Sequence, residues 1–199
     1  TGEWAARAAA EHENWSDELV RKMKSALKHD YAMLQRCAAE ALGQHPEYPA
    51  IRELAELLEN APAEDTHLRH VIRIALRNQL AGAGDEGFKT AASLEAPARR
   101  AIGELCVAVP SANAAKFILS HGMRADSSEE LRRAQFRHIA EHIDREHLDQ
   151  FAMVMRERNE SLDRQVDVFR YFLDGLSARG ETGDRIGGTI ADWGRELTQ

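Results

Sequence analysis

Apolar residues recur at intervals of three and four positions along most of the chain, which is the spacing of one face of an α-helix. The clearest example is the segment 65–81, whose apolar stripe consists of Leu68, Val71, Ile72, Ala75, Leu76 and Leu80. Asp65 and Thr66 stand where a helix needs an N-cap, and Gly82 stands where helices often end. Alternating β-branched runs are missing, so the pattern predicts an all-α protein.

The same spacing predicts helices over the rest of the chain, joined by short connections. The predicted helices cover residues 3–13, 17–29, 31–43, 48–60, 65–81, 95–108, 111–121, 128–143, 146–158, 162–178 and 184–197. Most breaks between them carry residues that stop or cap helices, as at 45–47, 61–63 and 109–111, where each break contains a proline.

A repeat is visible in where the helices begin. Helices that open an apparent pair start near Asp30, Asp65, Glu95, Glu129 and Leu162, so the steps are 35, 30, 34 and 33 residues. A period of about 33 residues with two helices per unit is typical of an α-solenoid. We therefore expect HEAT/armadillo-like repeats that form a right-handed superhelix of antiparallel helix pairs. A globular helix bundle, which needs no regular period, is the alternative.

This interpretation assigns residues 1–199 to one helical-repeat domain. Residues 1–29 would form capping helices, 30–180 the repeats and 181–199 a C-terminal helix. The expected core residues are Leu34, Leu42, Leu68, Ile72, Leu76, Ile102, Leu105, Phe136, Ile139, Phe151, Phe169 and Phe172. A lone helix pair cannot bury its apolar face, so these side chains should pack between neighbouring pairs.

Composition and charge narrow the possible functions. The chain has 43% hydrophobic residues, 30% charged residues and a formal net charge of −7, which argues against a general nucleic-acid binder. No apolar run has the length of a membrane span. The first residues, Thr-Gly-Glu-Trp, are neither a Met start nor a signal peptide, so we expect a mature or excised fragment. Cys37 and Cys106 are expected to be buried thiols, with a disulfide as the alternative.

Three segments resemble the helical repeats of very large secreted proteins of planctomycetes and related bacteria. They are DTHLRHVIRIALRNQL at 65–80, LCVAVPSANAAKFILSH at 105–121 and FRHIA at 136–140. Those proteins are described as membrane-bound dehydrogenases or haem-binding-domain proteins. The resemblance implies a β-propeller domain before the repeats, a c-type haem domain after them, and a periplasmic or secreted location. It implies no catalytic residue here, and the chain has no Cys-x-x-Cys-His motif to hold a c-type haem.

One predicted surface is cationic. Arg69, Arg73 and Arg77 follow one another at four-residue spacing on the helix over 65–81, beside His67 and His70. One interpretation is a solvated face that pairs with acidic residues of the next helix. The other is a groove wall that binds an acidic partner protein or a neighbouring domain, because the planar guanidinium group pairs well with carboxylates.

Two further candidate surfaces lie elsewhere. Residues 81–94 contain three glycines where a second helix is expected, which indicates either a shortened helix with a surface loop or a binding loop anchored by Phe88. The three tryptophans, Trp4, Trp15 and Trp193, all lie near the chain ends. Each either packs on its adjacent helix or, for Trp193 above all, marks a junction with a further domain.

One short motif could carry chemistry. His138-Ile-Ala-Glu141-His142 matches H-x-x-E-H, in which two histidines bind zinc and the glutamate acts as a base. Three fixed positions arise easily in a His-rich helical chain, so we expect two partly exposed histidines. The glycines of 82–87 match G-x-G-x-x-G, but no strand precedes them. We therefore expect a non-catalytic interaction scaffold without a cofactor; the alternative is a helical metal-binding or hydrolytic domain at the histidine motif.

Overall fold

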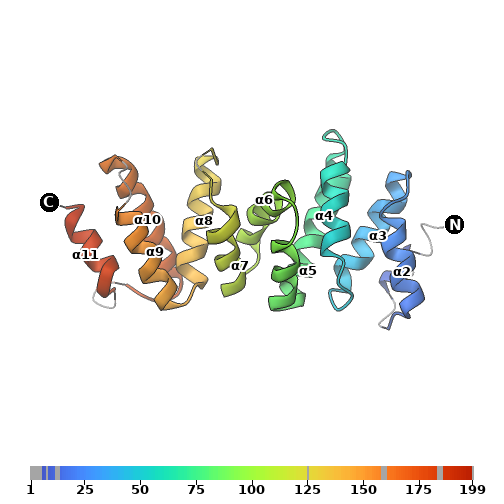
Figure 1. Cartoon of the computed structure of the whole chain (residues 1–199), viewed down its shortest axis with the longest axis horizontal. Coiled ribbons are helices and arrows are strands. Elements are labelled where there is room, and N and C mark those ends of the chain that lie inside the picture. The colour runs from blue at the N-terminus through green and yellow to red at the C-terminus, as the bar shows by residue number, and fades with distance from the viewer. Residues whose placement is uncertain are drawn as a thin grey trace. The chain divides into compact units, whose positions relative to one another are not determined.

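The computed structural model describes residues 6–7, 9–11, 14–124, 126–157, 161–182 and 186–198. Across these residues every regular element is helical and no strand occurs, which confirms the all-α prediction (Figure 1). The α-helices are α2 (Asp17–Ala26), α3 (Ala32–Gln44), α4 (Ile51–Asn60), α5 (Thr66–Ala92), α6 (Ala96–Leu105), α7 (Ala112–Phe117), α8 (Glu129–His142), α9 (Arg145–Glu157), α10 (Leu162–Ala178) and α11 (Gly188–Glu196). A 3₁₀ turn, η1 (Cys106–Ala108), follows α6, and a π-helical turn, η2 (Ile118–Gly122), follows α7.

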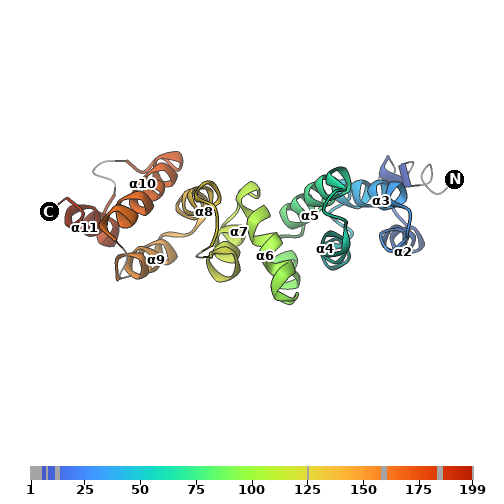
Figure 2. The same ribbon diagram turned by 90° about the horizontal axis from the view of Figure 1, so that it is seen from above.

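The chain divides into two compact units, unit 1 (Thr1–Val109) and unit 2 (Pro110–Gln199). Unit 1 contains α2 to α6, and unit 2 contains α7 to α11. Within each unit the helices lie side by side and are joined by short connections, as Figures 1 and 2 show. Each unit therefore has its own core. The helix predicted over 3–13 falls largely outside the described residues.

Helices begin at capping residues, as the sequence predicts. Ser16, Ser111 and Ser128 each accept a backbone hydrogen bond from the first turn of α2, α7 and α8. The carboxylate of Asp65 accepts from the N–H of Leu68 at 2.9 Å at the start of α5. These side chains satisfy backbone donors that have no partner inside the helix.

The main departure from the predicted helices is α5, which continues past Gly82 to Ala92. Its backbone leaves helical geometry at Gly84, where φ is 53° and ψ is −140°. Residues other than glycine rarely adopt such a positive φ, so the glycine at this position permits the helix to bend. Residues 81–92 are therefore helical on both sides of a bend at Gly84 and do not form a loop.

In unit 1, α3 and α5 lie side by side and run in the same direction. Arg36, in the first half of α3, pairs with Asp65 at the start of α5 at 2.8 Å. Gly43, near the end of α3, meets Ala75, which lies further along α5. A methyl carbon on Gly43 would stand 2.8 Å from the Cα of Ala75, so the absence of a side chain lets the two backbones approach.

A buried glutamine of α5 fixes the connection between α3 and α4. Gln79 is fully buried; its amide nitrogen donates to the carbonyl of Leu42 at 2.6 Å, and its amide oxygen accepts from the N–H of Ala50 at 2.9 Å. The carbonyls of His45 and Tyr48 each lie 3.3 Å from the same nitrogen. One side chain thus satisfies backbone groups from both ends of this connection.

Unit 2 repeats the parallel arrangement with α8 and α10. Contacts advance together along the two helices, from Glu129–Tyr171 through Arg133–Asp174 to Ala140–Arg179. At Gly175 the helices are so close that a methyl carbon would overlap the carbonyl oxygen of Arg137. α9 and α11 are parallel neighbours too, because Arg145 donates to the carbonyl of Gly187 and Arg156 pairs with Glu196.

Ten of the twelve predicted core residues are buried. The exceptions are Leu34 and Phe169, which are half-buried, and the ring of Phe169 packs edge-on against Trp193. Unit 2 has an aromatic core, with ring centroids 5.3 to 6.2 Å apart among Phe136, Phe151 and Phe172. The buried positions of α3, α4 and the first part of α5 are instead mainly Ala, Leu and Ile.

Candidate binding surface

The part of α5 before Gly84 presents one exposed side, which we call the α5 surface. It is formed by His67, His70, Arg73, Ile74 and Arg77. Residues 66–84 contain no Asp or Glu, so every charge on this stretch of helix is cationic. At a rise of about 1.5 Å per residue, the surface extends roughly 15 Å along the helix.

Several cationic residues of the α5 surface are not engaged in ion pairs within the part of the chain that the structure describes. In the described part of the chain, no carboxylate forms an ion pair with His70, Arg73 or Arg77. Along the chain, the acids that flank the surface are Asp65 before it, whose carboxylate is already paired with Arg36, and Asp85 and Glu86 after Gly84. The N–H of Leu68 and the guanidinium of Arg36 hold the pKa of Asp65 below its ordinary value, so it stays ionised and engaged.

Arg69 has a different role from the one predicted. The sequence groups it with Arg73 and Arg77, but its Nη1 donates to the carbonyls of Leu58 at 3.1 Å and Ala61 at 2.9 Å. These carbonyls lie at the end of α4, where helix geometry leaves acceptors without partners. Arg69 therefore has a structural contact at the junction between α4 and α5, which the sequence interpretation did not include.

The reason for this difference is the rotation of an α-helix. Each step of four residues turns a side chain by about 40°, so three residues at this spacing do not stay on one face. Arg69 and Arg73 are half-buried, whereas Arg77 is exposed. Alternating steps of three and four residues from His67 follow the exposed face and reach His70, Ile74 and Arg77. The sequence interpretation omits Ile74.

Phe88 is not the anchor of a binding loop. It is 8% exposed and lies in the helical continuation of α5. Gly87 is buried beside it, where a methyl carbon would stand 3.1 Å from Cδ1 of Ile51 in α4. This part of α5 packs against α4, so the apolar side chain of Phe88 faces the core rather than a partner.

Trp193 is a core residue of unit 2 and not a surface residue. It is 1% exposed, and its ring is edge-on to Phe172 with centroids 6.0 Å apart. Trp15 is likewise buried in unit 1, where it stacks on Tyr48 at 5.3 Å. Trp4 lies outside the described residues. A position near the chain end therefore does not make these two indoles available to another domain.

The histidine motif lies on α8. The rings of His138 and His142 are 4.5 Å apart, and Oε1 of Glu141 is 3.9 Å from Nε2 of His142. His138 is only 5% exposed, not partly exposed as expected, because it is on the inner side of α8. Burial, with His142 nearby, lowers the pKa of His138 to about 4. Among the described residues, no three His, Cys, Asp or Glu side chains are grouped as metal ligands would be.

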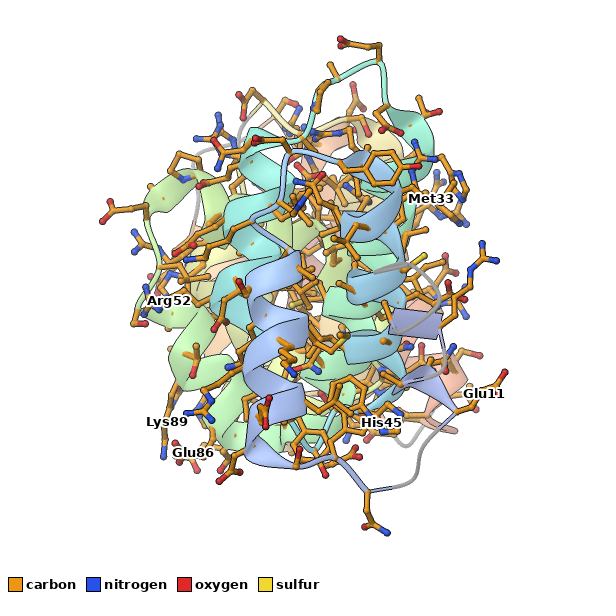
Figure 3. All side chains as sticks on the ribbon, turned by 90° about the vertical axis from the view of Figure 1, so that its right-hand side faces the viewer. Glu11, Met33, His45, Arg52, Glu86 and Lys89 are labelled. Atoms are coloured by element: carbon orange, nitrogen blue, oxygen red, sulfur yellow. The ribbon has the colours of Figure 1, made fainter. Side chains whose placement is uncertain are left out.

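Around α4 the charged side chains are of both signs and have partners close by. Figure 3 shows Arg52, Glu86 and Lys89 on one side of unit 1 and Met33 on the other. Lys89 pairs with Glu86 at 2.6 Å, and Arg52 donates to the hydroxyl of Ser93 at 3.0 Å. Charges on this side are therefore mixed in sign and satisfied locally, in contrast to the α5 surface.

Two cavities flank α4, with volumes of about 290 and 250 Å³. Lys28 of the first pairs with Glu56 at 3.7 Å, and Lys24 of the second pairs with Glu53 at 3.1 Å. The lysines that line these cavities are thus each paired with a glutamate of α4. Arg52, which lines the second cavity, donates to the hydroxyl of Ser93.

The two cysteines are free and buried, so the disulfide alternative is wrong. Burial raises the pKa of Cys106 to about 12, which leaves its thiol protonated and unreactive at neutral pH.

Among the described residues, no helix is both long and apolar enough to cross a membrane. No protein-family model matches the chain, and no match is found among curated proteins or solved structures.

Proposed function

We propose that this chain is a non-catalytic protein-binding scaffold, built as a HEAT/armadillo-like α-solenoid, with the α5 surface as its binding face. The observation that carries the proposal is the parallel contact between α3 and α5 and, independently, between α8 and α10. In a solenoid, equivalent helices of successive repeats stack in this way, and the stacked rows leave one side of each helix open to a partner.

The spacing of the helix starts supports the repeat. The helices that begin at Ala32, Thr66, Ala96, Glu129 and Leu162 follow one another at 34, 30, 33 and 33 residues. Both parallel pairs also use the same device for close packing, a glycine against an alanine or a backbone carbonyl, at Gly43 and at Gly175. A globular bundle would not require this regularity.

The resemblance to large secreted bacterial proteins adds an expectation about partners. If it holds, the scaffold binds neighbouring domains of its own parent chain, in the periplasm or outside the cell. Both an internal domain and a separate protein would use the same kind of surface, so the proposal covers either.

The repeat architecture can be tested by removing residues 162–199, which contain α10 and α11. In a solenoid each repeat contacts only its neighbours, so the shorter chain should stay helical and unfold cooperatively at a lower urea concentration. Circular dichroism with urea unfolding measures both properties. Loss of nearly all helical signal would instead indicate a single globular bundle.

The binding function can be tested by selection of random peptides displayed on phage against the immobilised chain. A protein-binding surface should enrich peptides that share a sequence pattern and that compete with one another. Failure to converge on any pattern in repeated selections would contradict the proposed scaffold function.

A further inference from the structure

We infer that the α5 surface binds an acidic peptide segment that carries an apolar residue between its carboxylates. The inference rests on the proposed scaffold function and names the chemistry of its partner. The partner segment can belong to another protein or to another domain of the same parent chain, because the recognised chemistry is the same.

Charge complementarity is the first argument. The chain as a whole carries a net charge of −7, yet residues 66–84 hold three arginines, two histidines and no acid. One of these arginines, Arg69, is used to cap α4, which leaves Arg73 and Arg77. Arg77 donates to the amide oxygen of its neighbour Asn78, a neutral group that a carboxylate can replace.

The exposed side chain of Ile74 is the reason for an apolar residue in the partner. This side chain is 38% exposed and lies between the cationic residues, with Arg73 before it and Arg77 after it. An exposed isoleucine gains nothing from a purely charged ligand, whereas an aliphatic side chain placed over it would be removed from water together with it. The surface therefore fits a segment that alternates acidic and apolar groups.

The same features favour a peptide over a nucleic acid. A nucleic acid presents a continuous row of phosphates, and an acidic chain of this net charge would repel it beyond the short α5 surface. The surface is about 15 Å long, which an extended peptide covers with about five residues. Glu-Glu-Leu-Glu-Glu, with blocked ends, has the matching length and chemistry.

Binding of this peptide to the full chain can be followed by amide chemical shifts in nuclear magnetic resonance spectra. We expect shifts that concentrate on residues 66–78 and that diminish when the salt concentration is raised, because exposed charges are screened over about 10 Å at 0.1 M salt. The peptides Lys-Lys-Leu-Lys-Lys and Glu-Glu-Gln-Glu-Glu serve as comparisons. The first should not shift residues 66–78, and the second should bind more weakly than the leucine peptide.

Matched variants separate this surface from general electrostatics. The double variant Arg73→Gln/Arg77→Gln should weaken binding roughly fivefold, as expected for the loss of two solvent-accessible charge contacts. The control Arg21→Gln/Lys28→Gln removes two cations from α2 and the residues that follow it, and should leave binding unchanged. Ile74→Ser should weaken the leucine peptide more than the glutamine peptide. Thermal unfolding of each variant verifies that its fold is retained.

Three results would overturn the inference. In the first, the arginine variant and the control weaken peptide binding equally. In the second, the amide shifts lie away from residues 66–78. In the third, single-stranded polyuridylate binds the same face more tightly than the acidic peptide does. The peptide selection keeps these failures distinct from failure of the scaffold itself. Convergence on peptides that are not acidic would contradict the acidic partner and leave the scaffold standing.

Discussion

Units 1 and 2 use the same parallel pairing of helices but hold it with different chemistry. In unit 1, Gln79 and Asn78 of α5 donate to backbone carbonyls of α3 or the connection after it. In unit 2, Arg179 donates to backbone carbonyls at the end of α8, but α8 and α10 are also joined at their surface by Arg133–Asp174, and aromatic rings fill the space beneath. Exposed ion pairs contribute little to stability, whereas buried hydrogen bonds and buried rings contribute more. The two units therefore differ in which substitutions should damage them.

The largest difference should come from the cores. Phe172→Ala should destabilise the protein by about 4 kcal/mol, because it removes a fully buried ring from the aromatic cluster of unit 2. Leu76→Ala, at an equally buried position in unit 1, should cost about 3 kcal/mol. Urea unfolding gives both values. A smaller loss for Phe172 than for Leu76 would show that the aromatic core can collapse around the missing ring.

The next comparison concerns the glycines between parallel helices. Gly175→Ala should cost about 3 kcal/mol, because the added methyl group overlaps a backbone carbonyl that cannot move alone. Gly43→Ala should cost less, since its added methyl carbon would stand 2.8 Å from the Cα of Ala75, a smaller overlap than the one with the carbonyl oxygen at Gly175. Gly187→Ala is the control, because its added carbon meets no atom within 4 Å. The melting temperature should be highest for Gly187→Ala, lower for Gly43→Ala and lowest for Gly175→Ala. Any other order contradicts the packing described.

The two buried glutamines provide a third comparison. Among the described residues, Gln79 makes hydrogen bonds to backbone groups of four residues, whereas Gln135 of α8 donates only to the carbonyl of Gly122. Gln79→Leu should cost about 2 kcal/mol, since it leaves several buried backbone groups without partners, and Gln135→Leu should cost about 1 kcal/mol. Equal losses, measured by urea unfolding, would mean that water replaces the missing amide at the α3–α4 connection.

Arg69 and Arg77 should differ although the sequence treats them alike. Arg69→Gln should cost about 1 kcal/mol, because it removes hydrogen bonds to the end of α4. Arg77→Gln should change stability by less than about 0.5 kcal/mol, as is usual at an exposed position. Thermal unfolding of the two single variants decides the matter. If Arg77→Gln lowers the stability as much as Arg69→Gln does, Arg77 contributes to folding and not to the proposed binding.

The smallest effect at neutral pH should be that of His138→Leu, which removes a buried ring whose Nε2 has no hydrogen-bond partner among the described residues. The unfolded chain protonates His138 below about pH 6.5, but the folded chain does so only near pH 4. Lowering the pH through this window therefore favours unfolding. Urea unfolding of His138→Leu should show a shallower loss of stability between these pH values. An unchanged slope would mean that other groups cause the acid sensitivity.

The helical class, most helix limits and ten core residues were predictable because each depends on local periodicity. The prediction failed at 81–94, where Gly82, Gly84 and Gly87 suggested a loop. Helix propensity is only a weak preference, and burial of Phe88 and Ala91 overrides it. The bend at Gly84 then absorbs the change of direction that a loop would otherwise provide.

The candidate surface on α5 was predicted less well than the fold. The absence of acids from 66–84 can be read from the sequence, so the cationic character was foreseen. The different contacts of Arg69 and Arg77 could not be predicted from the sequence. The carbonyls to which Arg69 donates become its neighbours only after α4 folds back on α5. The burial of Trp193 likewise depends on α11 packing beside Phe169 and Phe172.

The bend at Gly84 also determines how the chain resists proteases. A glycine-rich surface loop is a preferred site of nicking, because a protease must bind its substrate as an extended, unpaired strand. Here the backbone is helical on both sides of Gly84, and the second half is anchored by Phe88. A protease would have to unwind α5 before it could bind, so 81–94 should survive limited digestion intact despite its three glycines.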